Sequence, residues 1–146
     1  MRIAVLNGPN LNLLGTREPA IYGRTTLPEI EARLRDVARE LRVEIECAQH
    51  NGEGALVDAI QALRGRADAA IINAGAYSHT SLAIRDAFAA VAVPFVEVHL
   101  TNIFAREPER RHSTLAQGAH AVLCGFGAVG YELALRGLAA TLTSRV

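Results

Sequence analysis

The most informative absence in this 146-residue sequence is lysine, because all 15 basic residues are arginine. Without lysine the chain cannot form a Schiff base with a carbonyl substrate, bind pyridoxal phosphate through an imine, or place a P-loop lysine on a phosphate. The composition therefore excludes three kinds of mechanism. It leaves chemistry by tyrosine, histidine, carboxylate and arginine side chains.

An excess of either charge is also missing, since 15 acidic residues balance the 15 arginines. A neutral chain has no net field to attract phosphate backbones or anionic lipids, so we expect neither nucleic acid nor a membrane as partner. Only four apolar residues lie between Arg2 and Asn7. This run is too short for a signal peptide or a membrane span, and a cytoplasmic location is expected.

Cysteine is scarce and metal-binding motifs are absent. Cys47 and Cys124 lie in apolar, strand-like runs without CxxC spacing, which predicts buried thiols in a reducing compartment. The five histidines show no HExxH or comparable ligand pair, so no metal site is expected. A GxSxG elbow for an acyl-transfer serine is missing as well.

The length suits one domain over residues 1–146, in which strand-length apolar runs alternate with segments of helical period. This alternation predicts an α/β fold: a flavodoxin-like three-layer sandwich with a five-stranded parallel sheet, order 2-1-3-4-5, and helices on both faces. We expect strands over 2–6, 43–47, 69–73, 95–99 and 121–125, and helices over 26–42, from 56 to a stop at Gly65, over 81–91 and over 127–142.

Polar loops follow strands 1, 3 and 4 of this predicted sheet. Residues 7–23 form a connection too long for an ordinary strand-to-helix turn, residues 73–79 follow the third strand, and an arginine-bearing stretch follows the fourth. Ligands of doubly wound sheets bind beyond the carboxyl ends of the strands, where the strand order reverses. We therefore expect these three loops to meet in one functional crevice.

Glu97 and His99 are two residues apart on the fourth strand, so both side chains point to the same face. A carboxylate beside an imidazole fixes its tautomer and raises its basicity, which favours an acid or base; the alternative is a structural buried ion pair. Plainer roles are also open for Tyr22, which could pack its ring, and for His79, which could cap the following helix.

Residues 125–130 read GFGAVG and match GxGxxG between a strand and a helix. A dinucleotide site would also need a further strand and an acidic residue about twenty positions on, and both are missing. We interpret these glycines as turn and packing residues and expect no cofactor.

Four segments, GPNLNLLGTREPAIYG, INAGAYSHTSLAIRDA, VEVHLTNI and AREPERRHS, occur in this order. Together they resemble type II 3-dehydroquinate dehydratases of the shikimate and quinate pathways, and the likeness covers the whole chain. The resemblance implies a flavodoxin-like fold and a reaction without metal, cofactor or imine. It implies that 3-dehydroquinate becomes 3-dehydroshikimate and water by anti elimination through an enolate.

The resemblance also implies roles for particular residues. Tyr22 would be the base, and because a phenol is mostly protonated at neutral pH, Arg17 and Arg106 would favour its phenolate. Asn10 would hold a water at the enolate oxygen, and His99, oriented by Glu97, would protonate the leaving hydroxyl. Substrate contacts would come from Asn73, the backbone N–H groups of Leu100 and Thr101, His79, Arg110, and Asp86 of a neighbouring subunit, in a dodecamer built from four trimers.

The chain departs from the family pattern at a few positions, among them Ala74, where a proline is usual, Thr101, Gly52, and Pro108 with Glu109. A non-catalytic flavodoxin-like module for small-molecule binding or signalling is the alternative hypothesis. A receiver of that kind would need an aspartate after strand 3 and a lysine after strand 5. The sequence instead has Asn73 and no lysine.

Overall fold

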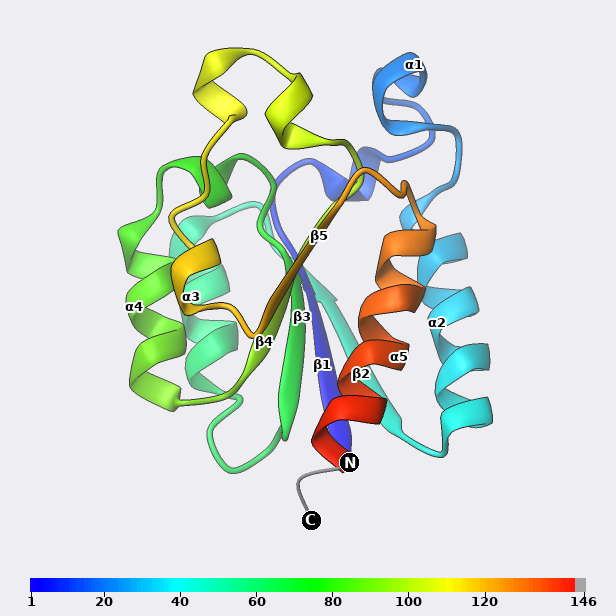
Figure 1. The fold of residues 1–146 in the computed structure, drawn as a ribbon, viewed down its shortest axis with the longest axis vertical. Coiled ribbons are helices and arrows are strands. Elements are labelled where there is room, and N and C mark those ends of the chain that lie inside the picture. The colour runs from blue at the N-terminus through cyan, green and yellow to red at the C-terminus, as the bar shows by residue number, and fades with distance from the viewer. Residues whose placement is uncertain (144–146) are drawn as a thin grey trace.

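A computed structural model describes residues 1–143. The strands form one parallel sheet in the order β2-β1-β3-β4-β5, which confirms the predicted flavodoxin-like α/β fold. Helices α3 and α4 cover one face and α2 and α5 the other (Figure 1). The bounds are Arg2–Asn7 (β1), Pro19–Tyr22 (α1), Leu27–Leu41 (α2), Glu44–Gln49 (β2), Glu53–Gln61 (α3), Ala69–Asn73 (β3), Leu82–Val91 (α4), Phe95–His99 (β4), Ala121–Cys124 (β5) and Val129–Thr143 (α5).

The central strands are the best-covered part of the sheet. Every residue of β3 and β4 is buried, whereas β2 and β5 at the edges are partly exposed. This agrees with a third strand that is apolar on both faces, whereas the face of the second strand that was predicted to be buried is only half-buried. Cys47 and Cys124 lie in the edge strands and are half-buried rather than buried, because helices cover edge strands less completely. Burial still raises the pKa of the Cys47 thiol to about 11.

Two apolar cores lie on the two sides of the sheet. One packs β1, β3 and β4 against α2 and α5 through residues such as Leu34 and Leu135, and the other packs them against α3 and α4 through Ile60 and Phe88. Burying a large aliphatic side chain stabilises a fold by roughly 1.5–3 kcal/mol. The helical stripes expected from the sequence therefore hold both faces of the sheet.

The ends of the helices follow local signals in most places. Thr26 and Glu29 form the expected capping box at the start of α2, and Ser81, not His79, caps α4 by accepting from the Ile84 N–H at 3.0 Å. The prediction for α3 was wrong at its end. That helix stops at Gln61, because residues 62–65 leave it through turns before Gly65 takes a φ of +73°.

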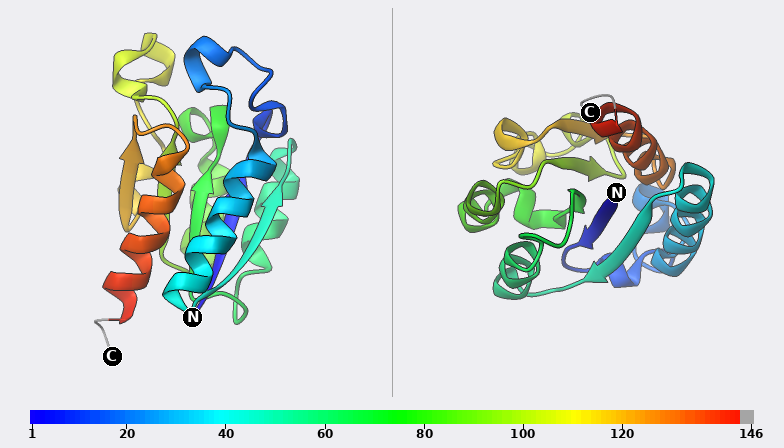
Figure 2. Two further views of the ribbon diagram at one scale, coloured as in Figure 1. Left: turned by 90° about the vertical axis from the view of Figure 1, so that its right-hand side faces the viewer. Right: turned by 90° about the horizontal axis from the view of Figure 1, so that it is seen from below.

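The loops at the carboxyl ends of the strands gather at one end of the molecule. Figures 1 and 2 show α1 and the arginine-bearing loop after β4 side by side there. The loops after β1 and β3 also meet, since the Gly8 N–H donates to the Asn73 carbonyl at 2.7 Å. A Cβ on Gly8 would lie 2.5 Å from the Ala74 carbonyl oxygen, so only glycine permits this approach.

Candidate active site

One cleft at this end of the sheet collects the residues that the sequence singled out. Of the twelve predicted residues, only Glu97 and Asp86 are absent from its lining. Glu97 is fully buried and bonded to His99, and Asp86 is exposed on α4. The cleft is lined by the predicted residues Asn10, Arg17, Tyr22, Asn73, His79, His99, Leu100, Thr101, Arg106 and Arg110.

Tyr22 ends the short helix α1 and lies between two guanidinium groups. The Arg17 guanidinium carbon is 4.7 Å from the ring centroid and that of Arg106 is 5.2 Å from it. The Arg106 Nη1 also donates to the phenol oxygen at 2.9 Å. The Tyr22 ring also packs against the apolar core, so its hydroxyl is held in the cleft by ring packing and by the bond from Arg106 together.

The backbone reaches Tyr22 through unusual dihedral angles. Glu18, directly before α1, has a φ of +39°, and Asn10 has a φ of +68°. Asparagine tolerates this left-handed region, but glutamate enters it at a cost of about 1 kcal/mol or more. Pro19 then begins α1 at a position where a missing N–H costs nothing. The turn before α1 therefore directs Tyr22 into the cleft.

Glu97 and His99 form a buried pair on β4, as the spacing predicted. The Nε2 of His99 lies 2.8 Å from Oε1 of Glu97, with side-chain exposures of 6% and 0%. A carboxylate accepts a hydrogen bond at this distance, so we assign the hydrogen to Nε2. This assignment leaves the other ring nitrogen of His99, Nδ1, without a hydrogen bond to Glu97.

His79 is held by a reciprocal contact with His112 that the sequence did not suggest. Its Nδ1 donates to the His112 carbonyl at 2.6 Å, and the His112 Nε2 donates to the His79 carbonyl at 2.8 Å. Burial lowers the pKa of His79, although the hydrogen bond to the His112 backbone partly opposes the shift. His79 is therefore neutral at pH 7, with Nε2 free to accept a hydrogen bond.

Asn73, at the end of β3, is held by a buried tyrosine. Its Nδ2 donates to the Tyr131 hydroxyl at 3.0 Å, its Oδ1 accepts from the Gly75 N–H at 3.1 Å, and the Tyr131 hydroxyl donates to Oδ1 of Asn7 at 2.6 Å. Burial raises the pKa of Tyr131, which stays a neutral donor. The GFGAVG segment thus brings Tyr131 into the protein beside Asn73.

The sequence analysis missed four residues around the cleft: Asn7, His112, Ser113 and Tyr131. His112 and Ser113 stand in the AREPERRHS segment, and Tyr131 directly follows GFGAVG. A polar residue next to a glycine turn or at the end of an arginine loop was the available signal. Their partners are distant in sequence, so periodicity could not reveal them.

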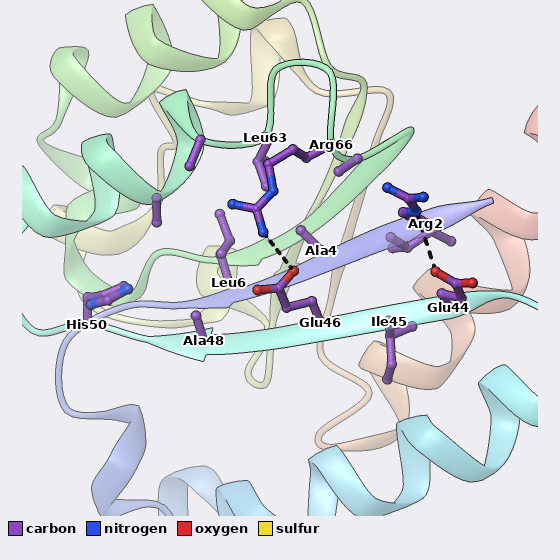
Figure 3. A pocket seen from close by; sticks show the side chains of 14 residues that line it. Arg2, Ala4, Leu6, Glu44, Ile45, Glu46, Ala48, His50, Leu63 and Arg66 are labelled. Carbon is purple, nitrogen blue, oxygen red and sulfur yellow. Dashed lines mark ion pairs between the residues drawn. The ribbon is translucent and has the colours of Figure 1, made fainter.

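A second cavity lies under α3, against the edge strand β2 (Figure 3). It measures about 470 Å³, far more than the 50 Å³ of free space in the cleft. Its polar rim is already paired, with Arg2 3.4 Å from Glu44 and Arg66 3.8 Å from Glu46. Residues suited to proton transfer gather in the smaller cleft, and there we place the site.

A buried carboxylate–imidazole pair and a phenol in contact with two arginines, together at the carboxyl ends of a doubly wound sheet, are typical of the active site of an α/β enzyme. The model of the family described as "Dehydroquinase class II" matches residues 1–139. The chain belongs to this family, the type II 3-dehydroquinate dehydratases, which are hydro-lyases.

Known relatives cover nearly the whole chain. A 3-dehydroquinate dehydratase of Gemmatimonas aurantiaca is 61% identical over 142 residues, 97% of this chain and 93% of the relative. A catabolic 3-dehydroquinase of Verticillium alfalfae is 54% identical over 134 residues, 92% of this chain and 89% of the relative. The crystal structure of a type II dehydroquinase from Butyrivibrio crossotus matches with a TM-score of 0.92 at 40% identity, covering 94% and 97% of the two chains.

These matches favour an enzyme over the alternative of a non-catalytic binding module. The strand order of the sheet is the one expected for the flavodoxin-like fold that the resemblance implied. Among residues 1–143, no helix is long and apolar enough to cross a bilayer.

Proposed function

We propose that this chain dehydrates 3-dehydroquinate to 3-dehydroshikimate by anti elimination through an enolate. One observation carries the proposal: the Tyr22 phenol with its two arginines and His99, which is bonded to the buried Glu97, line the same cleft. A base and an acid on different elements can act on two neighbouring carbons of one ring. The substrate itself comes from the family to which the chain belongs.

Tyr22 is the proposed base. Its phenolate takes the proton from the carbon next to the ketone, and the C–H electron pair moves into an enolate. Arg106, bonded to the phenol oxygen, and Arg17, over the ring, stabilise the phenolate before the proton is transferred. Asn10 lines the same cleft and is proposed to hold the water that donates to the enolate oxygen.

His99 is the proposed acid. The enolate electrons return to form the ring double bond, the bond to the C1 hydroxyl breaks, and a proton from His99 makes the leaving group water. Because Nε2 is bonded to Glu97, we assign the proton transfer to Nδ1. Glu97 balances the charge of the imidazolium that precedes this step.

The remaining cleft residues are proposed to bind the substrate. Asn73 and the backbone N–H groups of Leu100 and Thr101 would hold the carboxylate, a role that depends on geometry more than on side-chain charge. His79 and Arg110 would contact ring hydroxyls, His79 through its free Nε2 as acceptor. The cleft has room for a few water molecules at most, so Arg106 and its loop must move before a six-membered ring can enter.

Asp86 supports the proposed dodecamer of four trimers. It is exposed on α4, outside the cleft of its own chain, and Leu82 one turn earlier is a large apolar residue with 54% exposure. A neighbouring subunit could cover this face of α4 and receive Asp86 in its own cleft. The two free cysteines fit the reducing compartment of the proposed cytoplasmic location.

A direct assay tests the proposal. Purified protein mixed with 3-dehydroquinate should produce the ultraviolet absorption of the conjugated enone product, and no rise at high enzyme concentration would refute the proposed function. Tyr22→Phe should lower kcat by at least about 100-fold with the fold intact, since it removes the base. Near-normal turnover in that variant would assign the base to another residue.

A further inference from the structure

Ser113 lies at the end of the arginine-bearing loop and contacts the acid pair, Glu97 and His99, from the side away from the cleft. Its hydroxyl donates to Oε1 of Glu97 at 2.5 Å, the same oxygen that His99 Nε2 approaches at 2.8 Å. Ser113 is not among the residues that line the cleft. Its link to the acid pair is therefore through Glu97.

The direction of this hydrogen bond is fixed by two backbone donors. The N–H groups of Leu115 and Ala116 both donate to the Ser113 oxygen, at 3.0 and 3.1 Å. A serine hydroxyl has two lone pairs and one proton. With both lone pairs occupied, the proton has one acceptor, the Glu97 carboxylate.

Glu97 depends on that proton because it is fully buried and unevenly bonded. Oε1 accepts from both Ser113 and His99, whereas Oε2 has no partner among residues 1–143. A buried carboxylate needs hydrogen bonds to offset the loss of water. Among the described residues Ser113 thus supplies one of two donors to the Glu97 side chain, and it holds Oε1, rather than Oε2, toward the imidazole.

We propose that Ser113 is a positioning residue for the acid half of the reaction: by donating to Oε1 of Glu97 it fixes the orientation and tautomer of His99. The inference rests on the proposed function, because it assigns His99 the role of acid. It extends the chain of contacts from the Leu115 and Ala116 backbone through Ser113 and Glu97 to the ring of His99. The serine fixes the acid without touching the substrate.

Steady-state kinetics test the proposal with a matched pair of variants. Ser113→Ala should lower kcat about tenfold and leave KM within about twofold, because the serine does not reach the cleft. Ser113→Thr keeps a hydroxyl and should recover most of the lost kcat. The control is Thr114→Val, whose lost hydroxyl bonds the Ser78 and Ser81 carbonyls and not Glu97; its kcat should stay near the wild-type value.

An NMR measurement keeps this inference separate from the proposed function. The proton that His99 Nε2 donates to Glu97 should give a far-downfield resonance, which moves in Ser113→Ala and stays in place in Thr114→Val. If the wild-type protein fails to turn over 3-dehydroquinate, the proposed function is wrong, and the resonance still reports on the serine. An unchanged resonance, or a kcat in Ser113→Ala equal to that of the control, overturns the positioning role.

Discussion

The proposed acid half of the site, Glu97 and His99, lies on a strand whose residues are all buried, whereas the proposed base half, Tyr22 with Arg17 and Arg106, lies on the short helix α1 and on loops. Packing on both faces of the sheet holds the acid half in place before any ligand arrives. The base half is joined by the bond from Arg106 to Tyr22, which links segments 84 residues apart. We therefore expect one fixed wall, on β4, and one wall that opens and closes, around Tyr22 and Arg106.

The largest effect on kcat should come from a change in the fixed wall. Glu97→Gln removes the charge and can turn an N–H₂ group toward His99, which favours the wrong tautomer. We expect kcat to fall about 100-fold with KM nearly unchanged, as measured in steady-state assays. Glu46→Gln, at an exposed carboxylate of β2, is the control and should leave both constants unchanged. A large rise in KM for Glu97→Gln would mean that the fixed wall also binds substrate.

A change in the wall around Tyr22 and Arg106 should alter KM as well as kcat. Arg106→Ala removes the cation bonded to Tyr22 and the side chain that closes the cleft, so kcat/KM should fall about 10- to 100-fold with both constants affected. The melting temperature should hardly change, because Arg106 stabilises a loop and not the core. Arg24→Ala, at an exposed residue outside the cleft, is the control. A lower kcat with unchanged KM would contradict the proposed closure.

Replacing Tyr131, which holds Asn73, should affect turnover less than the changes above and should lower the free energy of unfolding more. Tyr131→Phe removes the hydrogen-bond partner of the Asn7 Oδ1 and of the Asn73 Nδ2, at a cost of about 1–3 kcal/mol for each unsatisfied group. Denaturant unfolding should show the loss, and KM should rise several-fold because Asn73 is less firmly held. Tyr77→Phe, whose hydroxyl bonds the exposed Asn51 carbonyl, should change neither. An unchanged KM would separate Tyr131 from substrate binding.

The smallest expected effect is on the pH dependence of stability. Burial lowers the pKa of His79 below the usual 6.5, so as pH falls below about 6.5 the unfolded chain takes up a proton that the folded protein does not. Stability therefore falls from that pH down to the lowered pKa of folded His79, and below it this contribution is constant. When the free energy of unfolding is plotted against pH, wild type and His79→Gln should have the same slope above pH 7. Equal slopes below pH 6.5 would contradict the assignment.

Much of this architecture could be read from local patterns. The strands over 69–73 and 95–99 were predicted to the residue, the capping box at Thr26 was recognised, and the strand order is the one expected. Period-two spacing also placed Glu97 and His99 together. The strands, the capping box and the Glu97–His99 pair depend on neighbours along the chain, so residue type and spacing were sufficient to find them, whereas the strand order was expected from the usual topology of such α/β folds.

Contacts between distant loops could not be read in this way. The Tyr131 hydroxyl meets Asn7 from 124 residues away, His112 meets His79 from 33 residues away, and Ser113 meets Glu97 across a loop. No sequence period links such pairs, because their contact depends on how the sheet brings its carboxyl-end loops together. The sequence alone was enough to place the strands and the Glu97–His99 pair, and only the packed fold decided what holds this pair, Tyr22 and Asn73 in place.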